Sequence, residues 1–474
     1  MAVVHMRKRV SLAAPTTEPE YLTPDERRAA GRALREKVPR GSQAGWSTPA
    51  DRGDPIEILK ASNEGRLLSL VPIRFGRMSE SPFAFYRGSA AIMAADLART
   101  PASGIRVQAC GDAHLMNFGG FMTPERNTIF DVNDLDETLP APFEWDVKRL
   151  AASVVIAAQH LKLSDSDAAR AAAGVALEYR EQIANYASMR ALDVWYDRVD
   201  LAKFEKIYAD EDLLSEARKR AQKRLEEGRR KSLPEHLYPK LVSVQGHRPR
   251  IKDEPPLIFH PTAEQAPGME SGFQEAIAGY RRSLPDHIRT LFDRFQWVDA
   301  ALKVVGVGSV GTMCGIALFL SSDDDPLILQ IKEARASVLE PFAGKSAYPN
   351  HGQRVILGQR LMQSASDVFL GWTTGVNGRH FYIRQLRDGK ISALIEDWDT
   401  RMLRAYARFC AQALARAHAR SGDAATIAGY LGSGRTMDDA LTEFAVEYAD
   451  QNQRDYRRFV GGIRRGEVKA TVEG

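Results

Sequence analysis

Four polar residues between positions 112 and 134 have types and spacing suited to phosphate chemistry. The chain reads GDAHLMN and, after the turn signal TPERN, TIFDVNDLDE. Phosphoryl transfer to a hydroxyl needs a carboxylate that orients the hydroxyl or accepts its proton, and an amide and a second carboxylate that hold Mg²⁺. The spacing therefore predicts Asp112 as the catalytic base and Asn117 and Asp131 as metal ligands, with Asp134 as a further candidate ligand. Each acid taken alone is also explained as a turn or cap residue.

A glycine-rich segment, VGVGSVG, begins at residue 305. A dinucleotide-binding fingerprint would require a helix directly after the glycines, but the strand-like runs TMCGIALFL and LILQIK follow instead. The sequence therefore predicts a hairpin that covers nucleotide phosphates, and a lysine on the next strand that pairs with them. These predicted nucleotide-binding residues are Gly306, Gly308, Ser309, Gly311 and Lys332. The alternative is an ordinary hairpin with an exposed lysine.

Helices are expected on both sides of these motifs. Ser81 and Pro82 are typical of a helix start, and a helix is predicted over residues 81–97. Apolar residues at helical spacing predict amphipathic helices over 144–162 and 401–421. We expect the helix over 144–162 to pack beneath the loop that carries Asp112.

Composition narrows the class of protein. The 474 residues are 44% hydrophobic and 27% charged, which predicts a globular protein of two or three lobes. Three scattered cysteines form neither a disulfide framework nor a CxxC metal site. A net charge of +4 gives no reason to expect nucleic acid or membrane binding, and no signal peptide or spanning segment is evident. A cytoplasmic location is the expectation.

The motifs resemble those of a known superfamily. GDAHLMN followed by FDVNDLDE resembles the pattern of aminoglycoside and choline phosphotransferases, which belong to the protein-kinase-like superfamily. The whole chain is similar to the bacterial family called domain of unknown function 2252, through SPFAFYRG, CGDAHLMNFGGF, NDLDETLPAPFEWDVKRLA, NHGQRVILGQR and FYIRQLRD. The phosphotransferase resemblance implies the roles given above for Asp112, Asn117, Asp131 and Lys332. It also implies that Asp146 braces the catalytic loop, and His114 is expected to shape that loop.

The order of the motifs is inverted relative to ordinary kinases, because the catalytic loop precedes the glycine-rich hairpin. Circular permutation explains this order, since rejoining a fold at new surface positions preserves its core contacts. The predicted fold class is α+β: a circularly permuted protein-kinase-like fold with a small antiparallel β lobe and a large helical lobe. In this interpretation FYIRQLRD leads to the hinge, with Gln385 and Leu386 near the adenine. The partner of Lys332 stays open, because Glu340 precedes a proline and the helix expected over 351–363 contains no Glu.

The predicted function is an ATP- and Mg²⁺-dependent phosphotransferase that acts on the hydroxyl of a small molecule. Arg74, Arg77 and Arg87 are candidates to bind an anionic substrate or a regulatory phosphate, or to form structural ion pairs. Nucleotidyl (AMP) transfer and a non-catalytic pseudokinase are the alternatives. The expected parts are an N-terminal extension (1–60), a large lobe with the catalytic and metal loops (61–200), an insertion (201–295), a small ATP-binding β lobe (296–388) and a helical return to the large lobe (389–474).

Overall fold

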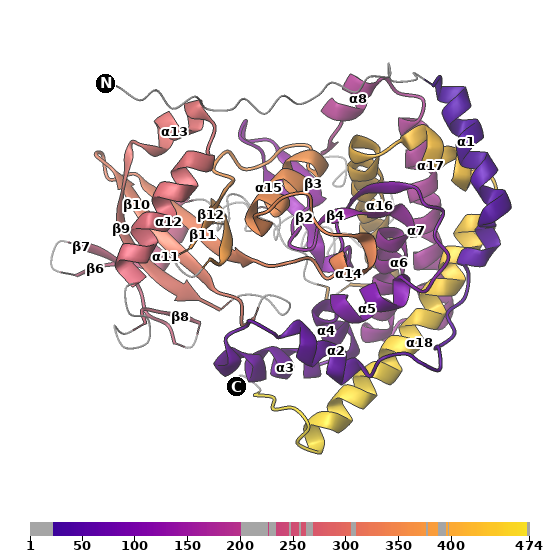
Figure 1. Cartoon of the computed structure of the whole chain (residues 1–474), viewed down its shortest axis with the longest axis horizontal. Helices are drawn as coiled ribbons and strands as arrows, with labels where there is room; N and C mark the ends of the chain where they lie inside the picture. Colours follow the sequence, from indigo (N-terminus) through magenta and orange to yellow (C-terminus); the bar gives the residue numbers. More distant parts are fainter. Residues whose placement is uncertain are drawn as a thin grey trace, which may run out of the picture.

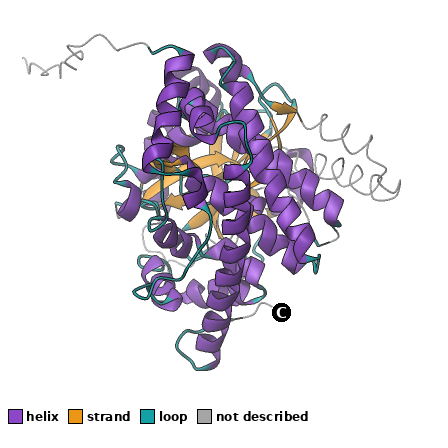
Figure 2. Cartoon of the chain, turned by 90° about the vertical axis from the view of Figure 1, so that its right-hand side faces the viewer, coloured by secondary structure: helices purple, strands orange, loops and turns teal. Residues whose placement is uncertain are grey.

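The protein is an α+β molecule with a β lobe and a larger helical lobe side by side (Figure 1). Viewed from the helical side, helices lie in front of the strands (Figure 2). No helix in the described part of the chain has the length and apolar composition needed to cross a membrane. The computed structural model describes residues 22–200, 226, 234–245, 248–255, 257–261, 269–304, 310–375, 378–386, 395–396 and 398–471.

The β lobe is built on a six-stranded antiparallel sheet with the order β12-β13-β11-β10-β9-β8. The register pairs Lys332 with Cys314 on one side and with Tyr382 on the other. The strand bearing Lys332 therefore lies between the strands that carry Cys314 and Tyr382 in one antiparallel sheet, which agrees with the antiparallel β lobe expected from the sequence. The strands are β8 (Ile258–Phe259), β9 (Phe295–Lys303), β10 (Cys314–Ser321), β11 (Pro326–Ala334), β12 (Gly371–Thr374) and β13 (His380–Gln385).

Helices pack on the two faces of this sheet. Helices α12 (Met269–Ser283) and α13 (Asp286–Phe292) cover the face that carries Leu329, through Tyr280 and Phe292. Helix α15 (His351–Met362) packs against Tyr382 and Ala334. Because successive strand side chains point to opposite faces, Lys332 lies on the α15 side and not on the α12 side. The outer part of the lobe also contains α11 (Pro234–Leu241), β6 (Val242–Gln245) and β7 (Arg248–Ile251).

The helical lobe is centred on α6 (Phe143–His160), which is buried from Phe143 to Ala158. The sequence predicted one buried face, but neighbouring helices enclose this helix on all sides, as its small alanine and serine side chains permit. These neighbours are α4 (Pro82–Gly88), α5 (Ala90–Leu97), α7 (Asp165–Tyr186), α16 (Thr400–Ser421) and α18 (Thr436–Arg464). The lobe also contains α3 (Val71–Ser79), α8 (Ala191–Tyr196) and α17 (Ala424–Leu431).

The helix predicted over 81–97 is two helices, α4 and α5, which meet at Ser89. The Ser81 hydroxyl accepts from the amide of Ala84 at 3.0 Å, so the predicted N-cap is confirmed. Short strands and turns connect this region to α6 and α7. They are β1 (Arg106–Ala109), η3 (Leu115–Asn117), β2 (Phe118–Met122), β3 (Thr128–Val132), β4 (Leu139–Pro142) and β5 (Val199–Asp200).

The segment expected to be an N-terminal extension (1–60) packs on the helical lobe from residue 22 onward. Helix α1 (Pro24–Lys37) packs on α17 so closely that a Cβ on Gly31 would lie 2.0 Å from the Thr426 carbonyl oxygen. After η1 (Arg40–Gln43), Arg52 pairs with Asp96 at 2.8 Å and with Asp455 at 2.6 Å. Helix α2 (Pro55–Ser62) and η2 (Leu68–Leu70) then lead to the candidate site.

Candidate functional site

The loop between β1 and η3 carries Asp112 and is held from below by α6. The Asp146 carboxylate accepts from the backbone amides of Cys110 at 2.6 Å and Gly111 at 2.9 Å, and it lies 3.1 Å from Nε2 of His418. Gly111 has φ +81°, and a Cβ there would lie 2.5 Å from the Glu137 carbonyl oxygen. Only glycine fits this position without strain. These contacts confirm that Asp146 braces the loop.

Asp112 is oriented by a buried arginine. Its carboxylate accepts from Nε of Arg149 at 2.6 Å, and Nη2 of Arg149 is 2.5 Å away. The Asp112 side chain keeps 19% of its surface exposed. Burial raises the pKa of Asp112, although the charges of Arg149 and Arg87 act in the opposite direction. Asp112 therefore has a fixed orientation and a carboxylate that is more basic than an ordinary aspartate.

His114 supports the loop in its neutral form. Its Nδ1 accepts from the amide of Met116 at 3.2 Å, so the ring proton belongs on Nε2, which lies 3.9 Å from the Asp112 carboxylate. Burial, followed by the charges of Arg149 and Arg87, lowers the pKa of His114 well below its usual value. This placement agrees with the predicted role of His114 in shaping the loop.

Asn117 and Asp134 line the same pocket as Asp112. The side-chain nitrogen of Asn117 donates to the Asp112 carbonyl at 2.7 Å, which leaves the amide oxygen as its ligand atom. Within the described residues, no three His, Cys, Asp or Glu side chains are arranged to hold a metal. Mg²⁺ usually takes one or two protein carboxylates and fills its shell with water and substrate phosphates. Asn117 and Asp134 fit that incomplete ligand set.

Asp131 lies away from this pocket. It is completely buried on β3, where its carboxylate pairs with Arg416 at 2.6 Å and accepts from the amide of Ser364 at 2.9 Å. Arg416 is also completely buried. A carboxylate enclosed by these partners is a structural counter-charge, so the placement does not support the metal-ligand role predicted for Asp131. Asp134, three residues later, is the acid that reaches the pocket.

Lys332 is buried next to two acids of the pocket, but it does not itself line the pocket. It pairs with an acid that was not selected from the sequence. Its ammonium is 2.7 Å from Asp136 and 3.7 Å from Asp134, and the Tyr382 hydroxyl donates to Asp136 at 2.5 Å. Burial works against ionisation of Asp136, but the charge and hydrogen bond of Lys332 and the hydrogen bond of Tyr382 lower its pKa to about 2. Glu340 lies 3.8 Å from His351 and forms no ion pair with Lys332.

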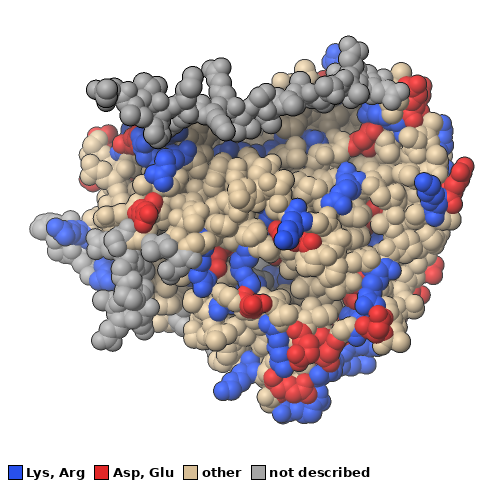
Figure 3. Space-filling view, viewed as in Figure 1, with Lys and Arg blue, Asp and Glu red and all other residues tan. Residues whose placement is uncertain are grey.

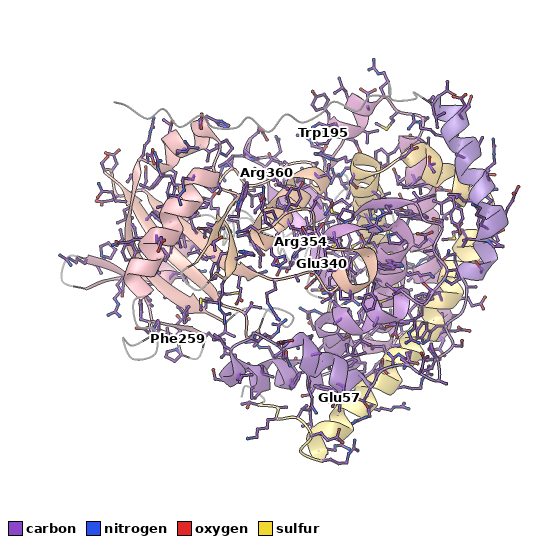
Figure 4. The ribbon with its side chains drawn as sticks, viewed as in Figure 1. Glu57, Trp195, Phe259, Glu340, Arg354 and Arg360 are labelled. Atoms are coloured by element: carbon purple, nitrogen blue, oxygen red, sulfur yellow. The ribbon has the colours of Figure 1, made fainter. Side chains whose placement is uncertain are left out.

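Helix α15 ties the acidic loop to the strand that carries Lys332. The Arg354 guanidinium donates to the carbonyls of Thr138 at 2.6 Å, Asp136 at 2.8 Å and Arg335 at 2.8 Å. Arg354 and Glu340 lie where the β lobe meets the helical lobe (Figure 4). The helix predicted over 351–363 is therefore present. The predicted fold would place a Glu on this helix as the partner of Lys332, but here the helix carries Arg354, which binds backbone carbonyls.

The nucleotide-binding residues predicted on the β lobe have different placements. Gly306, Gly308 and Ser309 lie outside the described residues. Gly311 has φ +88°, and its carbonyl accepts from the amide of Leu67 at 2.7 Å, which ties the end of the turn to the helical lobe. Gln385 and Leu386 do not line the pocket. The amide of Gln385 donates to the Asp367 carboxylate, and Leu386 is buried with its amide on the Ile328 carbonyl at 2.9 Å.

The pocket itself has a volume of about 250 Å³ and lies between the two lobes. A hollow with Lys and Arg atoms around and inside it is visible near the centre of the face in Figure 3. Its charged and amide lining is Arg66, Arg74, Arg87, Asp112, Asn117, Asp134, Asp136, Glu137, Glu333 and Arg335. The structure thus brings together three of the four predicted catalytic and metal residues. Arg74 and Arg87, two of the three arginines named as candidates for an anionic substrate, also line the pocket, whereas Arg77 does not. Asp136, Arg66 and Arg335 are additions that the sequence did not indicate.

A family model matches residues 66–461 of the chain, and its description is "Uncharacterized protein conserved in bacteria (DUF2252)". The chain belongs to this family. Neither the comparison with curated proteins nor the comparison with solved structures found a match. The matched region includes every pocket residue from Arg66 onward, so the site is part of what the DUF2252 family model describes.

Proposed function

We propose that this DUF2252 protein is an ATP- and Mg²⁺-dependent phosphotransferase that acts on the hydroxyl of a small molecule, on a circularly permuted kinase-like fold. One observation carries the proposal. The acids of the loop over 112–136 share a pocket with the strand that bears Lys332, although Lys332 and Asp136 are 196 residues apart in the chain. A carboxylate base, an amide, a second carboxylate and a lysine are the groups that phosphoryl transfer requires.

Asp112 is the proposed base. In this role it orients the acceptor hydroxyl and takes its proton as the oxygen attacks the terminal phosphate. A raised pKa suits this role, because a more basic carboxylate removes a hydroxyl proton more readily. Arg149 fixes the carboxylate before substrate arrives. This preorganisation reduces the entropy lost when the reacting atoms align.

Asn117 and Asp134 are the proposed Mg²⁺ ligands, and Lys332 is the proposed phosphate-pairing group. Mg²⁺ at this position supplies charge neutralisation for the phosphates during transfer. Lys332 is held by Asp136, which lines the pocket, so its ammonium is fixed in position next to that acid before nucleotide binds. A volume of 250 Å³ lies below the range of about 300–1,000 Å³ usual for ligand pockets, which suits the phosphate end of a nucleotide and a small acceptor.

The arrangement of the β lobe supports the circular permutation. The hairpin of β9 and β10, the lysine strand β11, helix α15 and the returning strand β13 follow one another in the chain, and β13 pairs directly with β11. The whole unit follows the Asp112 loop in sequence and still contacts it through Lys332 and Arg354. A permuted fold is expected to preserve such contacts while changing their order along the chain.

Nucleotidyl transfer is the second candidate, and it is favoured by one observation. Lys332 pairs with an aspartate of the metal loop, and no Glu on α15 is its partner, so the lysine environment differs from that of the expected kinase site. The same pocket could accept ATP in the reverse orientation, with the α-phosphate at Asp112.

The test is to incubate the protein with Mg²⁺ and ATP labelled at either the α or the γ position, together with a metabolite extract. Label from the γ position in a product supports phosphotransfer, and label from the α position supports nucleotidyl transfer. Asp112→Asn should abolish either product, whereas Asp323→Asn, an exposed turn residue of the β lobe, is the matched control. No labelled product, together with retained ATP binding, would contradict both proposals and favour a pseudokinase.

A further inference from the structure

Four arginines of the pocket make no ion pair. Arg66, Arg74, Arg87 and Arg335 all line it, and none has a carboxylate within 4.0 Å in the described part of the chain. Two other buried arginines do have such partners, because Arg149 pairs with Asp112 and Arg416 with Asp131. Arg354 is buried without a carboxylate but donates to three backbone carbonyls. The four pocket arginines differ from all of these because they line an open pocket.

Three of these guanidinium groups converge on one residue, Ser62, at the end of α2. Its carbonyl accepts from Nε of Arg66 at 3.3 Å and from Nη1 of Arg335 at 3.2 Å, and its hydroxyl lies 3.4 Å from Nη1 of Arg74. The three positive charges are thus held near one another by neutral oxygens. Burial, and then the charge of Arg335, lower the pKa of Arg66 to about 10, which is the effect expected of uncompensated neighbouring charges.

Arg74 and Arg87 retain unused donors. Arg74 is only 3% exposed, and it donates to the Asn63 side chain at 2.6 Å and the Gly88 carbonyl at 2.7 Å, but its buried Nε has no partner. The buried Nε of Arg87 has none either, and Arg87 makes no hydrogen bond to any residue that the structure describes. A buried donor without an acceptor costs free energy unless a ligand satisfies it.

The carboxylates that face the pocket are engaged elsewhere. Glu137 accepts from the amide of Val338 at 2.7 Å, and Glu333 accepts from the amide of Met313 at 2.8 Å and pairs with Arg379 at 2.8 Å. The lining holds five carboxylates and four arginines. Three of the carboxylates already pair with other cations, Asp112 with Arg149, Glu333 with Arg379 and Asp136 with Lys332, so they do not occupy the donors of the four arginines. A ligand with two negative charges and several acceptor oxygens matches the arginine donors that remain unoccupied.

We propose that Arg66, Arg74, Arg87 and Arg335 bind a phosphate group of the acceptor, so that the hydroxyl compound is itself a phosphorylated small molecule. The inference rests on the proposed phosphotransferase function. The position of Arg87 supports the inference, because Arg87 lines the same pocket as Asp112. An acceptor whose hydroxyl lies at Asp112 would place a phosphate a few bonds away at these arginines.

The competing explanation is that the arginines only cap the C-terminal end of α2, where cations stabilise the free carbonyls. Arg87 separates the two explanations, because it lines the pocket and makes no hydrogen bond to α2. Replacing Arg87 should weaken an anion site and leave the end of α2 unchanged.

The experiment is a calorimetric titration of the full chain with inorganic phosphate, at constant ionic strength, with and without a saturating non-hydrolysable ATP analogue and Mg²⁺. Arg87→Gln should weaken phosphate binding about 10- to 100-fold, as expected for a lost charge-assisted contact. Arg74→Lys is the second cluster variant. Lys60→Gln is the matched control, since it removes one positive charge from an exposed position on α2 and should change affinity less than twofold.

Phosphate binding that depends on Arg87 and persists with the analogue bound supports an acceptor phosphate site. Equal affinities for the wild type, Arg87→Gln and Arg74→Lys, or no phosphate binding at all, overturn the inference. Displacement of phosphate by the analogue also overturns it, because the arginines would then hold the phosphates of the nucleotide. Arg87-dependent phosphate binding by a protein that binds no nucleotide would refute the phosphotransferase proposal while leaving the anion site in place.

Discussion

Two regions of the molecule use buried charge in opposite ways. Around β3 and α16, Asp131 and Arg416 are both completely buried and face each other at 2.6 Å. In the pocket between the lobes, Arg74 is nearly as buried, but only neutral oxygens accept its hydrogen bonds. Both regions draw on the same residue types. They differ in whether the protein itself supplies the counter-charge.

Charges that are paired within the protein stabilise the fold, whereas pocket charges without a partner carboxylate are available to a ligand. A buried ion pair that is broken by removing one partner is strongly destabilising, because the other charge stays buried without compensation. Arginines that have no carboxylate partner gain a counter-charge when an anion binds to them. The position of a charged residue in a motif does not reveal which of these two roles it has, but its partners do.

The sharpest test of the pocket is the removal of the Asp112 carboxylate. Asp112→Asn should lower the rate of transfer by about 10²- to 10⁴-fold, the usual range for a lost general base, with Mg²⁺-ATP binding retained. Product formation from labelled ATP and nucleotide titration measure the two effects separately. Asp323→Asn should keep the wild-type rate. Undiminished transfer by Asp112→Asn would place the base elsewhere.

For the buried Asp131–Arg416 pair, we expect a substitution to reduce stability and not to affect the chemistry of the pocket directly. Asp131→Asn leaves Arg416 buried without its carboxylate and should reduce the free energy of unfolding by about 3–5 kcal/mol. Asp134→Asn should cost less than about 1 kcal/mol, because the Asp134 side chain is 34% exposed. Urea denaturation monitored by circular dichroism measures both. If the two variants are equally stable, the buried pair does not contribute more to stability than the pocket acid, which contradicts the contrast between the two regions.

Ligand binding should stabilise the pocket and leave the intrinsic strength of the Asp131–Arg416 pair unchanged. At a hundredfold excess over Kd, Mg²⁺-ATP should raise the free energy of unfolding by about 2.7 kcal/mol. Thermal melts with and without nucleotide measure this. Asp134→Asn should reduce the magnesium-dependent part of the stabilisation, because it removes a proposed ligand. No stabilisation at several millimolar nucleotide, with either Mg²⁺ or Mn²⁺, would contradict the nucleotide-binding proposal.

The smallest effect concerns the pH dependence of the Asp136–Lys332 pair. The pKa of Asp136 is lowered in the folded protein to about 2, below the unfolded value near 4, so ionised Asp136 stabilises the folded state. This contribution, about 2 kcal/mol, is complete above pH 4 and is lost as the pH falls from about 4 to about 2. The stability difference between the wild type and Asp136→Asn should therefore shrink over that interval. A difference that stays constant with pH would show that Asp136 does not titrate in this way.

Much of the framework follows from local sequence signals. The apolar runs before Ser321 and Lys332 form the paired strands β10 and β11, and Ser81 caps α4, because these features depend on neighbours in the chain. Asp146 was found through the resemblance and braces the loop as predicted. Helix α1 was overlooked even though Thr23 and Glu26 form a capping box, which is a readable start signal.

The sequence alone could not show which acids of DVNDLDE reach the pocket. The direction of each side chain depends on where β3 ends, and the counter-charge of Asp131 is Arg416, 285 residues later. Asp136 could likewise not be identified from the sequence, because its partners Lys332 and Tyr382 come from a sheet that is distant in the chain. Spacing within a motif identifies candidate residues, but long-range partners decide which of them reach the pocket.

The docking of α1 on α17 also has a consequence for biosynthesis. The ion pair between Arg27 and Asp423 joins positions 396 residues apart. At roughly 5–20 residues per second, the ribosome adds Asp423 about 20–80 s after it has added Arg27. During this interval the face of α1 around Gly31, which packs on α17, has no native partner. Completion of the helical lobe is therefore a late, largely post-translational event, whereas the hairpin of β10 and β11 can form soon after its residues leave the exit tunnel.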